Sequence, residues 1–70
     1  MIEQQFIERQ GEEGKPVVVG RAFSPIIPPQ GSTIALGDTV YFVEQVMYEY
    51  NAHKPRMPIE RVHLKVSLVP

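Results

Sequence analysis

Apolar and polar residues alternate strictly near the C-terminal end of the chain. From position 61 to position 68 the sequence reads Arg-Val-His-Leu-Lys-Val-Ser-Leu, with an aliphatic residue at every second place. Successive side chains of a β-strand point to opposite faces, so this period of two predicts a strand with one buried face and one exposed face. The residues expected in the core are Val62, Leu64, Val66 and Leu68, and those expected in solvent are Arg61, His63, Lys65 and Ser67.

The stretch from Thr39 to Tyr50 is also expected to be a strand, because it is rich in the β-branched and aromatic residues that suit a pleated surface. Glu44 interrupts its apolar face, where an unpaired carboxylate is not expected, and so predicts a β-bulge or a break into two strands. The core face would carry Val40, Phe42, Val46, Tyr48 and Tyr50, and the outward face would carry Tyr41, Val43 and Met47.

A helix is the competing interpretation of the same stretch. Asp38 or Thr39 would cap it, and the apolar residues at positions 40, 43, 47 and 50 recur at helical spacing. We favour the strand because valine, tyrosine and phenylalanine fit a sheet better than a helix.

The N-terminal segment fits two structures. Ile2, Phe6 and Ile7 suit either a short helix that ends at Gly11 or a strand. As a strand, the segment would pair with residues 16–23 through a polar turn from Gly11 to Gly14. This hairpin is the simpler arrangement. Further along the chain, irregular or turn segments are expected at residues 25–32, 37–38 and 51–58.

Together these elements predict one small all-β domain over residues 1–70, with about five short strands in one antiparallel sheet or small barrel. In size and strand count the chain resembles SH3-like and OB-like small barrels. It carries no sequence motif of either group, so the resemblance concerns architecture and implies no function.

The length and the absence of cysteine exclude several kinds of chemistry. No disulfide framework, thiolate metal site or cysteine nucleophile is available to these 70 residues. A core this thin would lose much of its packing to a ligand pocket of roughly 300 Å³. The longest apolar runs, residues 17–19 and 40–43, fall far below the ~20 residues that span a bilayer. Residues 1–5 resemble no secretion signal, so a cytoplasmic location without membrane contact is expected.

Candidate catalytic and metal-binding residues are few. His53 and His63 have Glu49 and Glu60 nearby in sequence, but their spacing matches no zinc-ligand signature. No serine lies in a Gly-x-Ser-x-Gly motif, and no glycine-rich segment precedes a helix that would hold a phosphate. We therefore expect a protein that is not an enzyme and that uses no cofactor or metal ion.

The charges are divided unevenly along the chain. Four acids and one base occupy residues 1–14, whereas four bases and one acid occupy residues 51–70. A surface built from the last strand and the loop before it would therefore be basic. The cationic and titratable residues expected there are Lys54, Arg56, Arg61, His63 and Lys65.

Two functional hypotheses use this surface. In the first, Tyr41 and Met47 form an exposed apolar row beside the cations, and the chain binds a protein partner or a second copy of itself through a sheet face or an edge strand. Such a module would be a homo-oligomer, or a small modulator of a larger complex. In the second, single-stranded RNA or DNA binds there, with cations on phosphates and a ring on a base. The predicted contact residues are Tyr41, Met47, Lys54, Arg56, Arg61, His63 and Lys65.

Overall fold

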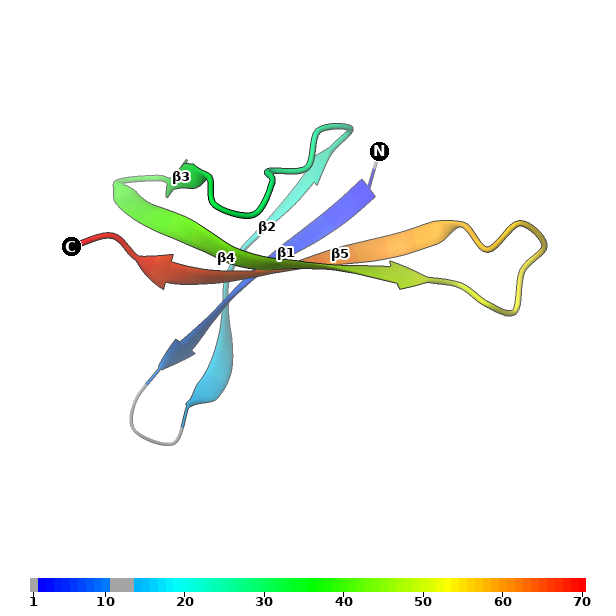
Figure 1. Ribbon diagram of the computed structural model, residues 1–70, viewed down its shortest axis with the longest axis horizontal. Coiled ribbons are helices and arrows are strands. Elements are labelled where there is room, and N and C mark those ends of the chain that lie inside the picture. The colour runs from blue at the N-terminus through cyan, green and yellow to red at the C-terminus, as the bar shows by residue number, and fades with distance from the viewer. Residues whose placement is uncertain (1, 11–13) are drawn as a thin grey trace.

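The computed structural model, which describes residues 2–10 and 14–70, contains five β-strands (Figure 1). They are β1 (Ile2–Gln10), β2 (Lys15–Ser24), β3 (Thr33–Leu36), β4 (Thr39–Tyr50) and β5 (Ile59–Leu68). The all-β prediction is confirmed, and both segments for which a helix was the alternative are strands. The described residues contain no helix that is long and apolar enough to cross a membrane.

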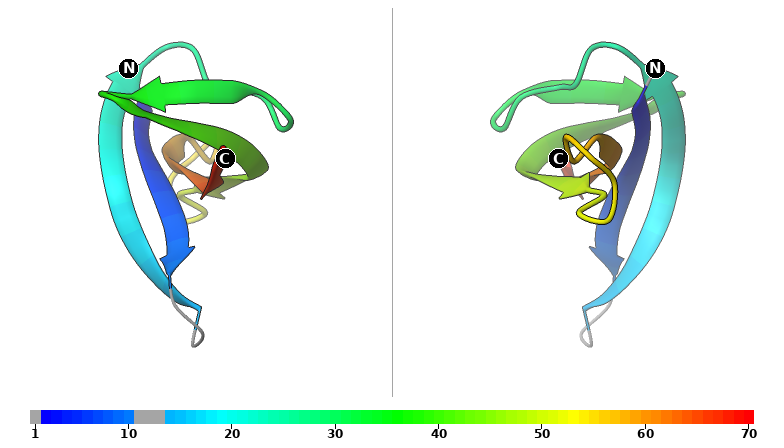
Figure 2. Two further views of the ribbon diagram at one scale, coloured as in Figure 1. Left: turned by 90° about the vertical axis from the view of Figure 1, so that its left-hand side faces the viewer. Right: turned by 90° about the vertical axis from the view of Figure 1, so that its right-hand side faces the viewer.

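The strands form one sheet in the order β2-β1-β5-β4-β3. Hairpins join β1 to β2 and β4 to β5, as the sequence predicted, and a third hairpin joins β3 to β4. The predicted antiparallel sheet differs at one place, because β1 and β5 run parallel. After β1 the chain forms the edge strand β2 and then the opposite edge strand β3. It returns through β4 to β5, which lies beside β1. The sheet is strongly curled into a half-barrel (Figure 2).

The core fills the concave side of this half-barrel. Its buried residues come from β1, β4 and β5, and partly buried residues of β2, β3 and the connection after β2 pack against them. The prediction for β5 holds for Val62, Leu64 and Val66, whereas Leu68 at the strand end is 57% exposed. The buried apolar residues are Phe6, Tyr41, Val43, Val62, Leu64 and Val66.

A β-bulge at Glu44 changes which residues of β4 face the core. Val43 pairs with Val66 and Gln45 pairs with Lys65, so Glu44 is the extra residue between them. The predicted bulge is confirmed. An extra residue shifts the alternation by one place, and the two halves of β4 therefore follow different parities.

The face prediction for the first half of β4 was therefore wrong. Tyr41 and Val43 are buried, with 8% and 0% exposure, while Val40 and Phe42 face outward. The prediction assumed that one alternation runs through the whole of β4, whereas the extra residue Glu44 shifts it by one place. Beyond Glu44 it was right, since residues 46, 48 and 50 lie opposite core-side residues of β5.

Two local features fix the connections between strands. Gly37 begins the two-residue turn between β3 and β4 with φ +64, in the left-handed region that favoured hairpin turns require at this place. Gln4, only 2% exposed, donates from Nε2 to the backbone oxygen of Ile26 at 2.8 Å and so ties the connection over residues 25–32 to β1. Of the predicted turn over Gly11 to Gly14, residues 11–13 lie outside the described residues.

Candidate interaction surfaces

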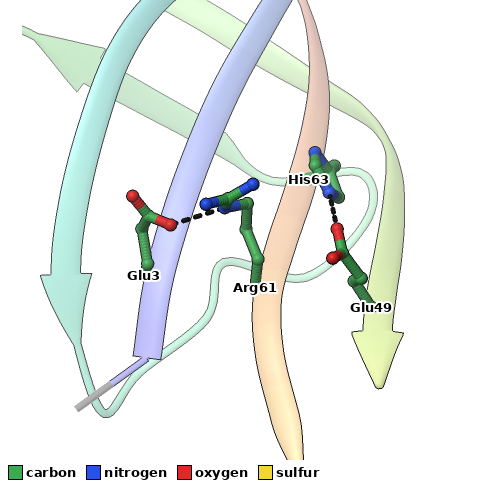
Figure 3. Close-up of polar contacts among 4 residues, drawn as sticks. All are labelled: Glu3, Glu49, Arg61 and His63. Carbon is green, nitrogen blue, oxygen red and sulfur yellow. Dashed lines mark hydrogen bonds and ion pairs between the residues drawn. The ribbon is translucent and has the colours of Figure 1, made fainter. Parts of the chain in front are cut away.

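The three predicted basic side chains of β5 point to the convex face, as expected, but each meets a carboxylate there. The Arg61 Nε donates to Oε2 of Glu3 on β1, and the His63 Nε2 lies 2.8 Å from Oε1 of Glu49 on β4 (Figure 3). Lys65 Nζ lies 3.5 Å from Oε2 of the bulge residue Glu44. The positive charges of β5 are therefore compensated by carboxylates of neighbouring residues, and β5 does not present the uncompensated basic row that the sequence suggested.

Two pKa shifts show how closely these groups interact. The hydrogen bond with Glu3 and the charge of Glu3 raise the pKa of the Arg61 guanidinium. The hydrogen bond with His63 lowers the pKa of the Glu49 carboxyl, a lowering that partial desolvation opposes and the charges of His63 and Arg61 support. These side chains of β5 are thus already engaged with neighbouring strands, which leaves less charge on β5 for a phosphate.

The two apolar residues predicted to lie beside these cations are on opposite faces of the sheet. Met47 is 55% exposed on the convex face, where it pairs with His63. Tyr41 is buried in the core against β3 and cannot contact a partner, because the bulge at Glu44 reverses its face. The predicted apolar row therefore does not exist, and Tyr41 is removed from the contact residues.

The far end of the β4–β5 hairpin extends beyond the rest of the sheet (Figure 1). We call residues 48–60 the arm. β3 pairs with β4 only as far as Phe42, and β1 pairs with β5 only from Arg61 onward, so no other strand among the described residues flanks the arm. Its core-side residues Tyr48 and Tyr50 are consequently 46% and 56% exposed.

These two tyrosines are spaced like neighbours on one strand face, about 7 Å apart. Met57, in the loop at the end of the arm, is equally exposed at 56%. We call Tyr48, Tyr50 and Met57 the arm patch. The sequence reasoning placed both tyrosines in the core and did not single out Met57. No local pattern in the sequence shows this exposure, because it depends on where β3, a strand of four residues, stops pairing with the twelve-residue β4.

The loop of the arm carries cations without an acidic partner. Lys54 and Arg56 are exposed, and neither forms an ion pair with another described residue. This distinguishes them from Arg61, His63 and Lys65. The free positive charge of the C-terminal third thus lies at the end of the arm.

Hydrogen bonds and backbone geometry fix the shape of this loop. Asn51 donates from its backbone to Pro58 at 2.9 Å and from Nδ2 to Glu60 at 2.7 Å, and its Oδ1 accepts from the His53 amide at 3.0 Å. Arg56 and Met57 adopt φ values of +67 and +40, which are costly for residues with a Cβ. The hydrogen bonds of Asn51 to Pro58 and Glu60 join the two sides of this loop.

The two histidines do not converge. His53 is exposed in the loop of the arm, whereas His63 is engaged with Glu49 on the convex face. Within the described ranges, no three His, Asp or Glu side chains gather in a group that could hold a metal ion.

A shallow, open cleft of about 410 Å³ lies where β1 and β5 diverge. The parallel pairing ends at Glu8 and Val66, and beyond it the ends of both strands line the cleft with the Lys65–Glu44 ion pair. Charges of both signs line this cleft, which is open to solvent and does not enclose a ligand as small-molecule sites commonly do.

Comparison with known proteins gives no further guidance: the chain matches no protein-family model, no curated protein and no solved structure.

Proposed function

We propose that this protein is a non-catalytic interaction module that binds another protein through the arm, as a small modulator of a larger complex. The observation that carries the proposal is the arm patch, in which Tyr48 and Tyr50 stay half-exposed on the part of the hairpin that no other described strand flanks. Exposed apolar clusters on small proteins commonly mark interaction sites.

The chemistry of the arm indicates the chemistry of the partner. Tyrosine supplies a large contact area with little conformational freedom to lose, and it is enriched among the residues that dominate binding energy. Lys54 and Arg56 flank this patch without acidic partners of their own. The arm therefore fits a protein surface with an apolar pocket bordered by carboxylates, which would speed association at low salt.

Single-stranded nucleic acid is the alternative ligand. Fewer residues now support nucleic-acid binding, because three of the five residues expected to contact phosphate are engaged with Glu3, Glu44 and Glu49. What remains for nucleic-acid binding are the two tyrosines and the two loop cations, which is a small positively charged surface for a chain with pI ≈ 6.1.

The cytoplasmic location stays a prediction.

The test begins with a photo-crosslinking amino acid at Met57, which identifies the bound protein in cells. The affinity of the purified partner is then measured for the wild type, for Tyr48→Ser/Tyr50→Ser and for Phe42→Ser. Phe42 is the matched control, since it is 40% exposed but lies on the other face. Two anchor tyrosines contributing about 2 kcal/mol each predict roughly 1,000-fold weaker binding for the double variant and little change for the control.

Equal affinity of the wild type and the double variant would contradict the proposal. A separate binding experiment uses a fluorescent single-stranded oligonucleotide at low salt. Binding that the wild type shows and Lys54→Glu/Arg56→Glu loses would instead support the nucleic-acid alternative.

A further inference from the structure

The sheet has a long edge at β2 that no other described strand flanks. β2 pairs with β1 on one side only, through nine of its ten residues, and it forms the outer margin of the half-barrel (Figure 2). None of the other backbone hydrogen bonds among the described residues reaches residues 15–24. Such an edge presents backbone donors and acceptors that another strand can satisfy. Its exposed apolar residues are Val17, Val18 and Phe23.

A bulge near the middle of β2 shifts the alternation of its side chains between the two faces of the sheet. Phe6 pairs with Gly20 and Ile7 pairs with Val18, so Val19 is the extra residue. On the convex side this leaves Pro16 and Val18 before the bulge and Arg21 and Phe23 after it. On the concave side it leaves Lys15 and Val17 before the bulge and Gly20 and Ala22 after it.

Consider two copies of β2 placed antiparallel about a two-fold axis, with all ten residues overlapping. Lys15 then faces Ser24 of the second copy, and the axis passes between Val19 and Gly20. In this register, convex residues meet convex residues and concave residues meet concave residues along the strand, because the bulge lies at the axis. A register shifted by one residue would put residues of opposite faces against each other.

The same register also matches the side chains. Pro16 faces Phe23 and Val17 faces Ala22, so apolar residues meet on both faces. Arg21, which has no ion pair among the described residues, faces Val18 and not a second cation. Centring the axis on Arg21 would instead place two arginines against each other, which is unfavourable.

We propose that the β2 edge binds a second copy of this chain, so that two half-barrels share one continuous sheet across a two-fold axis, with Val18 opposite Arg21. An isologous contact of this kind closes on itself and covers the edge, so it protects the chain from open-ended strand addition. The β2 edge is separate from the arm, which belongs to β4 and β5 at another part of the sheet.

The test is a charge series at Val18, which is 44% exposed and tolerates a polar side chain. Val18→Glu places a carboxylate opposite Arg21 of the second copy, and Val18→Lys places a cation there, twice per dimer. From typical cross-strand energies, the dimer dissociation constant should be at least about tenfold higher for Val18→Lys than for Val18→Glu. Adding Arg21→Glu to Val18→Lys should restore the dimer. Sedimentation equilibrium at low salt measures each constant.

A wild-type chain that stays monomeric at about 1 mM would overturn the proposal. So would equal dissociation constants for the lysine and glutamate variants, because the register requires Val18 and Arg21 to meet. Circular dichroism of each variant confirms that it is folded. Tyr48→Ser/Tyr50→Ser should dimerise like the wild type, so failure of the arm proposal and failure of this one give different results.

Discussion

At the scale of single residues, the structure separates two side chains that the sequence treated alike. Tyr41 and Met47 were both expected on an exposed row, yet Tyr41 is 8% exposed and Met47 is 55% exposed. The difference arises from one inserted residue between them, Glu44, and not from their own chemistry. No hydropathy value of either residue would have revealed it.

This difference predicts opposite outcomes for the same substitution. Tyr41→Ser removes a buried ring and should lower the free energy of unfolding by about 3–5 kcal/mol, whereas Met47→Ser should change it by less than about 1 kcal/mol. Urea denaturation followed by circular dichroism measures both. Similar losses for the two variants would mean that the face assignment around the bulge is incorrect.

At the scale of elements, much of the strand pattern was readable from the sequence. The alternation of residues 61–68 gave the correct core face of β5, and the flanking turn residues placed the β4–β5 hairpin. Local signals suffice there because strand period and turn chemistry are properties of neighbouring residues. β3 was not assigned, since four residues are too few to show a period.

The candidate site was less predictable than the strands. Which faces β4 presents depends on the bulge, and whether Tyr48 and Tyr50 are covered depends on where β1 and β3 stop pairing. Likewise, the carboxylates that engage Arg61 and His63 come from two other strands. Glu44 indicated the bulge, but the ends of strand pairing and the ion pairs are contacts between distant segments, about which single-sequence patterns carry no information.

The pair of Glu49 and His63 links β4 to β5 and makes stability depend on pH. The pKa of Glu49 is lowered in the folded state, chiefly by its hydrogen bond with His63. A carboxyl with a lowered folded pKa stabilises the fold above its unfolded pKa of about 4.3, and this contribution disappears as the pH falls through the folded pKa. Wild type should therefore be more stable than Glu49→Gln at pH 6, and the difference should shrink on acidification below about pH 4.

Denaturation midpoints of both proteins between pH 6 and pH 3 measure this effect. In a His63→Gln background the pH dependence of the difference should largely vanish, because the largest cause of the shift is removed. A constant difference across the whole range would show that the pair does not form in solution.

At the scale of the whole molecule, the fold is a sheet curled until its two edges approach each other. β2 and β3 are the edges, and they are the elements farthest apart in the strand order. The two edges meet at Gly20, where an added Cβ would lie 3.3 Å from Cδ1 of Leu36 and 3.7 Å from Cδ2 of Phe6. The absence of a side chain at Gly20 is what lets Leu36 close the concave side.

This closure predicts a coupling between the two edge strands. Gly20→Val would push Leu36 away from Phe6 and should lower the free energy of unfolding by about 1–3 kcal/mol, as overpacking does. Leu36→Ala alone should cost about 1–3 kcal/mol through lost apolar burial. In the double variant the valine would occupy the space that the leucine leaves, so the combined loss should be smaller than the sum by about 1 kcal/mol. A double-mutant cycle in urea measures this coupling. Strictly additive losses would mean that β2 and β3 do not meet across the core, and the half-barrel would then be more open than its curled sheet indicates.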